Sequence, residues 1–201
     1  VRQVLQNREH QFVNQGQYED AIAIANKLHD IDPNGNHLLR AEFYKRELSN
    51  DSYFIDNFKS SPTDSTNFVQ AIYILGRKKR TNDILKAINV FSKSAGDDVK
   101  KLTLIKNSYG LIGHWQEKEE IDKHLVKIQP DQYASWYDLA KTRILLGKTN
   151  EALSDLEKAL IIHANSETNA IDIKKDIMTN LLFKPFFEHP KIKPLLKPTP
   201  K

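Results

Sequence analysis

Few residues of this chain have the types and the spacing that chemistry requires. Its 201 residues include seven histidines and no cysteine. No histidine pair has the His-Glu-x-x-His spacing that puts two zinc ligands on one helical face. The Gly-x-Ser-x-Gly turn that exposes a nucleophilic serine is absent from the sequence as well. We therefore expect no catalytic residue, no metal-ligand set and no cofactor.

Two short segments resemble parts of ligand-binding loops, and both fail on spacing. The segment Asp30-Ile-Asp-Pro-Asn-Gly35 begins like a calcium loop, but its twelfth position is Ala41, where a bidentate glutamate is needed. The segment Gly147-Lys-Thr149 ends like a phosphate-binding loop, but Thr142 stands where that motif needs another glycine. We interpret both segments as turns between helices.

The basic residues do not form a nucleic-acid-binding pattern. A run of four cations from Arg77 to Arg80 could bind phosphate groups, but it follows Gly76 where a turn is expected, and no aromatic residue interleaves it. Residues 184–201 hold five lysines and one glutamate, which together account for the net charge of +4. The rest of the chain is neutral, so we expect no nucleic-acid partner.

The sequence contains no apolar run near the roughly 20 residues of a membrane span. The chain begins with Val1 inside an apolar-patterned stretch, which suggests a fragment of a longer protein. We expect no membrane insertion in this fragment. The compartment, and whether the parent chain is anchored in a membrane, stay open.

Turn-forming and apolar residues recur with a period of 34. Four residues spaced 34 apart each stand at the end of a stretch with helical apolar spacing: Pro62, Gly96, Pro130 and Ala164. Apolar columns with the same period are Phe68, Leu102 and Trp136; Ala71, Ile105 and Leu139; and Phe91, Leu125 and Ala159. Each period predicts one helical hairpin whose apolar face is covered by the next hairpin. If Trp136 packs in such a column, Trp136→Ala should cost about 3–5 kcal/mol.

Two segments, Trp136–Leu160 and Gly16–Pro33, resemble tetratricopeptide repeats. Small, aromatic and apolar residues stand at the family's positions, among them Tyr18, Ala21, Leu139, Ala140, Gly147, Ala152, Ala159 and Leu160. The resemblance covers about residues 2–165. It implies an all-α, right-handed superhelix of about five helical hairpins plus a C-terminal capping helix.

Three units depart from the family's pattern. The unit from Ser65 to Asp98 keeps only part of it. Pro62 follows Pro33 by 29 residues, which predicts a short and irregular hairpin. In the unit from Val99 to Gln132, Lys118 and Asp122 stand where apolar residues are expected, which predicts a second helix shifted in register.

We expect the solenoid to span residues 1–183 and to end in an amphipathic capping helix. That helix covers residues 166–183, with its candidate contacts at Ile171, Ile173, Ile177 and Leu181. Residues 184–201 form a Pro/Lys-rich tail. Because large apolar residues such as Phe186 and Ile192 are costly to leave in water, folding back on the last hairpin is favoured over a free docking peptide.

In such a superhelix the first helices of the hairpins line the concave surface. Projecting the period onto these helices leaves two rows outside the packing columns, namely Val69, Thr103 and Tyr137, and Tyr73, Asn107 and Lys141. Adding Lys100, we expect the partner-binding residues to be Tyr73, Asn107, Tyr137, Lys141 and Lys100.

The resemblance implies a non-enzymatic protein–protein interaction module that binds a peptide or protein segment in this groove. The alternative is a scaffolding or regulatory domain of a larger enzyme or membrane protein. The Lys/Asn clamp with which the family holds a C-terminal carboxylate is not reproduced in this sequence.

Overall fold

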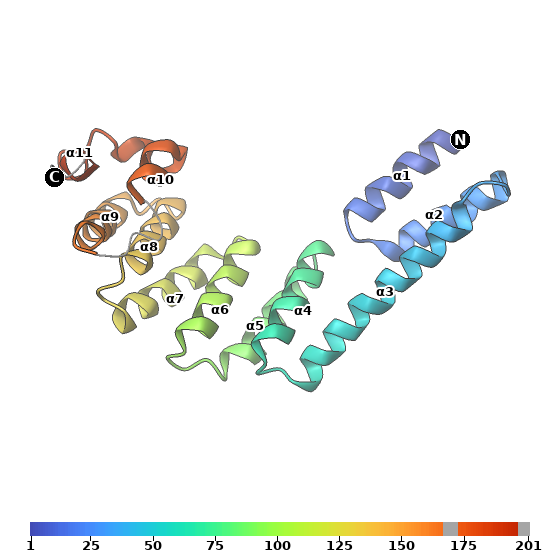
Figure 1. Ribbon diagram of the computed structural model, residues 1–201, viewed down its shortest axis with the longest axis horizontal. Helices are drawn as coiled ribbons and strands as arrows, with labels where there is room; N and C mark the ends of the chain where they lie inside the picture. The colour runs from blue at the N-terminus through green and yellow to red at the C-terminus, as the bar shows by residue number, and fades with distance from the viewer. Residues whose placement is uncertain (167–172, 197–201) are drawn as a thin grey trace. The chain divides into compact units, whose positions relative to one another are not determined.

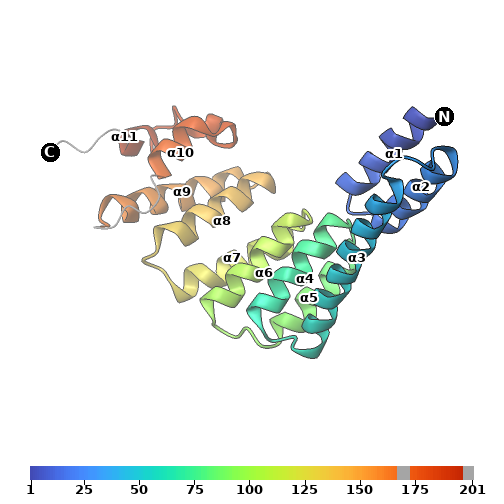
Figure 2. The ribbon, with the colours of Figure 1, turned by 45° about the vertical axis from the view of Figure 1, so that its right-hand side comes forward.

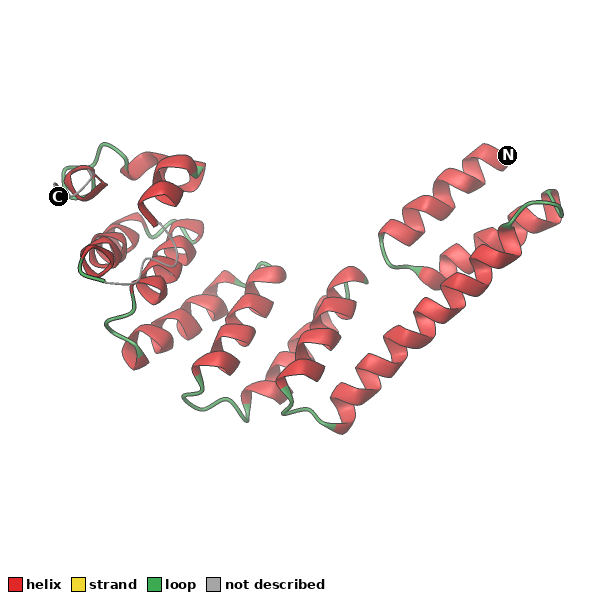
Figure 3. Ribbon diagram, in the orientation of Figure 1, coloured by secondary structure: helices red, strands yellow, loops and turns green. Residues whose placement is uncertain are grey.

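The computed structural model describes residues 1–166 and 173–196, and the regular secondary structure in this part of the chain is helical (Figure 3). The all-α helical-repeat class predicted from the sequence is confirmed. The chain divides into two compact units, Val1–Gly96 and Asp97–Lys201. Each unit is described by itself.

Unit 1 contains two helical hairpins joined by one long helix (Figure 1). Its elements are α1 (Arg2–Asn14), α2 (Tyr18–Ile31), α3 (His37–Ser60), α4 (Ser65–Arg77) and α5 (Thr81–Ser92). The expected short hairpin between Pro33 and Pro62 is wrong, because α3 fills that segment as a single helix of 24 residues. No glycine or proline interrupts residues 37–61, so nothing in the sequence breaks the helix there.

The core of unit 1 depends on small residues at one end and stacked rings at the other. Near the N-terminus, Ala21, Ala25 and Ala41 are buried and let α2 and α3 approach closely between Tyr18 and Tyr44. Farther along, three phenylalanine rings from α3, α4 and α5 lie together: Phe68 stacks on Phe91, and Phe58 lies tilted against Phe68 at an interplanar angle of 55°.

Unit 2 contains two regular hairpins followed by a C-terminal segment. The hairpins are α6 (Val99–Leu111) with α7 (Trp115–Ile128), and α8 (Tyr133–Leu145) with α9 (Thr149–Ala164). The segment consists of α10 (Ile173–Thr179), the 3-10 helix η1 (Leu181–Phe186) and α11 (Lys193–Leu196).

The turns inside three hairpins follow the 34-residue period. Gly113 and Gly147 have φ of 74° and 73°, a left-handed conformation that glycine adopts without strain. Lys79, which precedes Gly113 by 34 residues, takes the same conformation with φ of 53°, at some cost for a residue with a Cβ. Gly76, expected at this turn, lies inside α4 instead.

The C-terminal segment packs on the last hairpin (Figure 2). Ile173, Ile177, Phe183, Phe186 and Ile192 are buried in one cluster with apolar residues of α8 and α9. Leu181, an expected contact, is 81% exposed instead. Ile171 lies outside the described residues, as do residues 197–201 of the tail.

Trp136 is only half-buried, which changes the expectation for its removal. Its ring packs at the edge of the α8–α9 cluster, Nε1 donates to the carbonyl oxygen of Pro130 at 2.8 Å, and the Lys158 ammonium lies 3.7 Å from the ring centroid. Part of the ring contacts solvent in the folded state, so Trp136→Ala should cost less than the 3–5 kcal/mol of a core position.

The stacked rings give a sharper test of the core. Phe91 is fully buried and lies parallel to Phe68, with ring centroids 4.0 Å apart. Phe91→Ala should lower the free energy of unfolding by about 3–5 kcal/mol in urea titrations. The matched variant Tyr53→Ala, which removes an exposed ring from the same unit, should change it by less than about 0.5 kcal/mol. Equal losses of unfolding free energy in the two variants would contradict the assignment of Phe91 to the core.

Candidate functional site

The two predicted tyrosines differ in exposure. Tyr73 is 63% exposed on α4, with the Arg77 guanidinium 5.7 Å from its ring centroid. Tyr137 is only 4% exposed, its ring stacks on Phe183, and its hydroxyl donates to Asp176 of α10. The expectation that Tyr137 lies outside the packing is therefore wrong, because the C-terminal segment covers it.

Asn107 and Lys141 line one cavity in unit 2. It has a volume of about 250 Å³ and lies among α6, α7, α8 and η1; its other lining residues are Lys118, Asp138, Thr142, Leu145 and Leu182. The Lys141 ammonium is paired with Asp138 at 2.7 Å, so the cavity does not offer an unpaired cation there. Lys100 is exposed in the first turn of α6, apart from this cavity.

The predicted register shift in α7 is also wrong. The helices α5, α7 and α9 begin at Thr81, Trp115 and Thr149, which are 34 residues apart. Lys118 and Asp122 therefore occupy the same positions as Ile84 and Ile88 in α5, and as Ala152 and Leu156 in α9. These charged residues stand in the interior of the hairpin rather than turning away from it.

A buried polar network takes the place of apolar contacts at these positions. The carboxylate of Asp122, 1% exposed, accepts hydrogen bonds from Lys118 and from the Thr142 hydroxyl, each at 2.6 Å. Lys106, 6% exposed, places its ammonium 3.5 Å from the other oxygen of Asp122 and donates to Asp138 of α8. The network joins α6, α7 and α8 by charge-assisted hydrogen bonds.

A second polar network joins α7, α8 and α9. Glu119 is buried and accepts hydrogen bonds from Arg143 at 3.1 Å and from Lys148 at 2.5 Å. Arg143 also donates to the buried carboxylate of Asp155 at 2.7 Å. Burial raises the pKa of the Asp155 carboxyl above its usual value despite Arg143. These interactions hold the hairpins together and leave no charge for a ligand to neutralise.

The basic run from Arg77 to Arg80 is tied to the unit 1 scaffold. Arg77 donates to the Tyr18 hydroxyl at 2.7 Å, Lys78 pairs with the buried carboxylate of Asp51 at 3.4 Å, and Arg80 donates to Asp83 at 2.7 Å. The run closes the α4–α5 turn over the middle of α3, in line with its interpretation as a turn.

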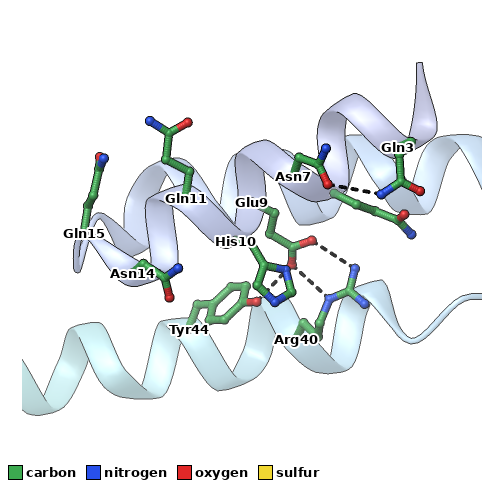
Figure 4. A pocket seen from close by; sticks show the side chains of 10 residues that line it. Gln3, Asn7, Glu9, His10, Gln11, Asn14, Gln15, Arg40 and Tyr44 are labelled. Atoms are coloured by element: carbon green, nitrogen blue, oxygen red, sulfur yellow. Dashed lines mark hydrogen bonds and ion pairs between the residues drawn. The ribbon is translucent and has the colours of Figure 1, made fainter.

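A groove of unit 1 lies between α1 and α3 (Figure 4). Its volume is about 740 Å³. It is lined by ten polar side chains, five of them carboxamides of α1 and a sixth the carboxamide of Gln15 at its C-cap: Gln3, Gln6, Asn7, Glu9, His10, Gln11, Asn14, Gln15, Arg40 and Tyr44. A polypeptide or another polar molecule could hydrogen-bond to such a wall along its length.

The two walls of this groove are joined by one buried carboxylate. Glu9, 3% exposed, points from α1 toward α3 and accepts two hydrogen bonds from Arg40, at 2.9 and 3.0 Å, and one from the Tyr44 hydroxyl at 3.0 Å (Figure 4). Burial and the bond to Glu9 raise the pKa of Tyr44 to about 12. The charges of Glu9 and Arg40 are thus satisfied within the protein.

Our reading of the sequence missed this groove, although the sequence carries a signal for it. Gln3, Asn7 and Gln11 follow one another at steps of four in α1, and Gln15 follows at its C-cap. The 34-residue columns do not reach this helix, because α1 lies outside the register of α4, α6 and α8.

Comparisons with known proteins give only distant structural likeness. No family model matches the sequence, and no curated protein matches it. Among solved structures, MamA 41-end from Desulfovibrio magneticus RS-1 aligns at 13% identity over 83% of this chain and 97% of that chain, with a TM-score of 0.48. MamA MSR-1 C2 aligns at 12% identity over 82% of this chain and 97% of that one, with a TM-score of 0.47. At these scores the likeness carries no argument about function.

The described residues contain no group of three or more histidine, aspartate or glutamate side chains arranged to hold a metal ion. No helix among residues 1–166 and 173–196 combines the length and the apolar character that crossing a bilayer requires.

The network around Asp122 predicts a contrast between two variants. Asp122→Ala leaves the ammonium groups of Lys106 and Lys118 with fewer partners in the interior, so unfolding should become easier by about 3–5 kcal/mol. The triple variant Lys106→Ile/Lys118→Ile/Asp122→Leu follows the apolar residues of neighbouring hairpins and should stay within about 2 kcal/mol of the parent. Urea titrations that find the triple variant less stable than Asp122→Ala would contradict this account.

The same network predicts a loss of stability in acid. Burial raises the pKa of Asp138, but the ammonium groups of Lys106 and Lys141 outweigh it and hold that pKa below its usual value; Lys148 and Arg143 do the same for Glu119. A carboxyl whose pKa is lowered by folding stabilises the protein above its unfolded pKa, and this contribution is lost as pH falls through the folded pKa. Stability should therefore drop below about pH 4.5, the ordinary carboxyl range.

The variant Asp138→Asn checks the assignment. It cannot release a proton, so the difference in unfolding free energy between parent and variant should shrink between about pH 5 and pH 3. A difference that stays constant over this range would show that Asp138 does not contribute to the acid sensitivity.

Proposed function

We propose that the chain is a non-enzymatic, tetratricopeptide-like interaction module that binds an extended segment of a partner protein. The observation that carries the proposal is the α1–α3 groove, which is lined by polar side chains that both donate and accept hydrogen bonds. Two helices joined through Glu9 form its walls, so the groove exists before a partner arrives.

The proposal keeps four of the residues expected from the sequence as further contacts. Tyr73 presents an exposed ring in unit 1, and Lys100 is exposed in unit 2. Asn107 and Lys141 share the 250 Å³ cavity, whose polar lining could receive one side chain of a partner. Tyr137 is withdrawn because it is buried.

A peptide-display selection tests the proposal. Twelve-residue peptides selected on the whole chain should bind it at least about tenfold more tightly than the variant Asn7→Ala/Gln11→Ala/Asn14→Ala, because three hydrogen bonds are worth about 0.5–1.5 kcal/mol each. Asn26→Ala, which removes an exposed carboxamide from α2, is the matched control and should leave the affinity unchanged.

Other outcomes would move or remove the site. Peptides that bind the triple variant normally but lose affinity for Asn107→Ala/Lys141→Ala would place the site in the unit 2 cavity. A selection that yields no peptide with affinity for the folded chain would contradict the proposed function.

A further inference from the structure

An apolar pocket lies among α3, α4 and α5 of unit 1. These three helices pack side by side (Figure 2), and the pocket has a volume of about 300 Å³. Six of its ten lining residues are apolar and come from all three helices: Ile55, Phe58, Ala71, Leu75, Ala87 and Val90. None of the ten lines the α1–α3 groove, so this pocket is a separate candidate site.

The apolar lining runs from the core of unit 1 to its surface. Ala71, Leu75 and Ala87 are buried, whereas Val90 is 40% exposed. Because Ala71 and Ala87 have small side chains, the protein itself does not fill the space between α3 and α5. An apolar ligand that enters this space removes apolar surface from water, which favours binding.

Charged side chains line the rest of the pocket, and their balance is positive. They are three cations, Lys59, Arg80 and Lys86, and one carboxylate, Asp83. Asp83 accepts hydrogen bonds from Arg80 at 2.7 Å and from Lys86 at 3.2 Å, so two cations share it. These hydrogen bonds hold the pKa of the Asp83 carboxyl below its usual value. With Asp56, which pairs with Lys59 at 2.8 Å, three cations face two carboxylates.

The two lysines of the pocket have donors left for a ligand. An ammonium group carries three N–H donors. Lys59 gives one to Asp56, and Lys86 gives one to Asp83. Both side chains are largely exposed, so each ammonium can turn toward an anion in the pocket without loss of buried contacts.

The size and the charge of the pocket define a class of ligand. Its volume of about 300 Å³ is at the lower end for small-molecule sites, and it is too small for a helix about 10–12 Å across. An apolar body fits the lining, and one negative group fits the excess of cations at the surface. A positively charged amphipath of the same size would be repelled.

We propose that the pocket among α3, α4 and α5 binds a small amphipathic carboxylate, with its apolar chain between α3 and α5 and its carboxylate at Lys59 and Lys86. The proposal does not rest on the function proposed above, because no residue lines both sites.

The test is a titration of the whole chain with octanoate, followed by the NMR signals of the methyl groups. The signals of Ala71, Leu75, Ala87 and Val90 should shift, whereas that of Ala25, which is buried in α2, should not. Octylammonium, which has the same chain and the opposite charge, should bind at least about fivefold more weakly, because the cations attract one head group and repel the other.

Two variants test the place of the carboxylate. Lys59→Ala/Lys86→Ala should weaken octanoate binding at least about threefold and reduce the difference between octanoate and octylammonium. Lys45→Ala is the matched control, since Lys45 is also an exposed lysine of α3 that pairs with an acid three residues away, and it does not line the pocket. This control should leave both affinities unchanged.

A third variant tests the apolar wall. Val90→Glu places a negative charge beside the apolar chain, so it should weaken octanoate binding and should not weaken octylammonium binding. Because Val90 is partly exposed, the variant should remain folded, and circular dichroism and urea titration verify this for every variant.

Octanoate that shifts none of the pocket signals, or that binds no more tightly than octylammonium, would overturn the proposal. Octanoate binding that survives Lys59→Ala/Lys86→Ala undiminished would overturn the assignment of the carboxylate to these lysines. Raising salt from about 0.05 to 0.5 M should weaken octanoate binding, since exposed charges are screened.

Discussion

The salt-bridged carboxylate of Asp122 is the interaction on which the arrangement of α6, α7 and α8 depends. Regular hairpins in this chain bury isoleucine, alanine or leucine at the positions of Lys106, Lys118 and Asp122. A carboxylate in the interior is stable only if its hydrogen-bond partners stand at fixed distances, whereas apolar contacts tolerate sliding. The α6–α7 hairpin therefore packs against α8 in the position that brings Asp138 to Lys106 and Thr142 to Asp122.

Unit 1 uses buried carboxylates in a similar way. Glu9 joins α1 to α3, and Asp51 of α3 lies beside the cations that close the α4–α5 turn. Glu9 and Arg40 pair with each other across the two helices, so the same contact joins the two walls of the groove and pairs their charges. Most of the other side chains that line the groove are neutral carboxamides.

The sequence predicted the periodic part of the fold well, since Gly113, Gly147 and the apolar columns repeat at 34 residues. It predicted α3 poorly, because the repeat expectation outweighed the absence of any helix breaker between His37 and Ser60. It misplaced Tyr137, since the residues that cover it come from a segment outside the repeat. Lys118 and Asp122 departed from the apolar pattern of the repeat, and the sequence alone did not explain why, because their partners Lys106 and Thr142 come near them only in the folded chain. Two of the expected site residues, Asn107 and Lys141, do share a cavity, but the pairing of Lys141 with Asp138 could not be predicted from spacing.

The undivided helix α3 has a consequence for how unit 1 unfolds. In an array of separate hairpins, an end hairpin can melt while the next one stays intact, because each contacts only its neighbours. Here the first half of α3 covers α2 and its second half packs on α4, within one run of backbone hydrogen bonds. Fraying from the N-terminus would have to break this shared helix, so amide hydrogens of α2 and α4 should exchange as one cooperative block.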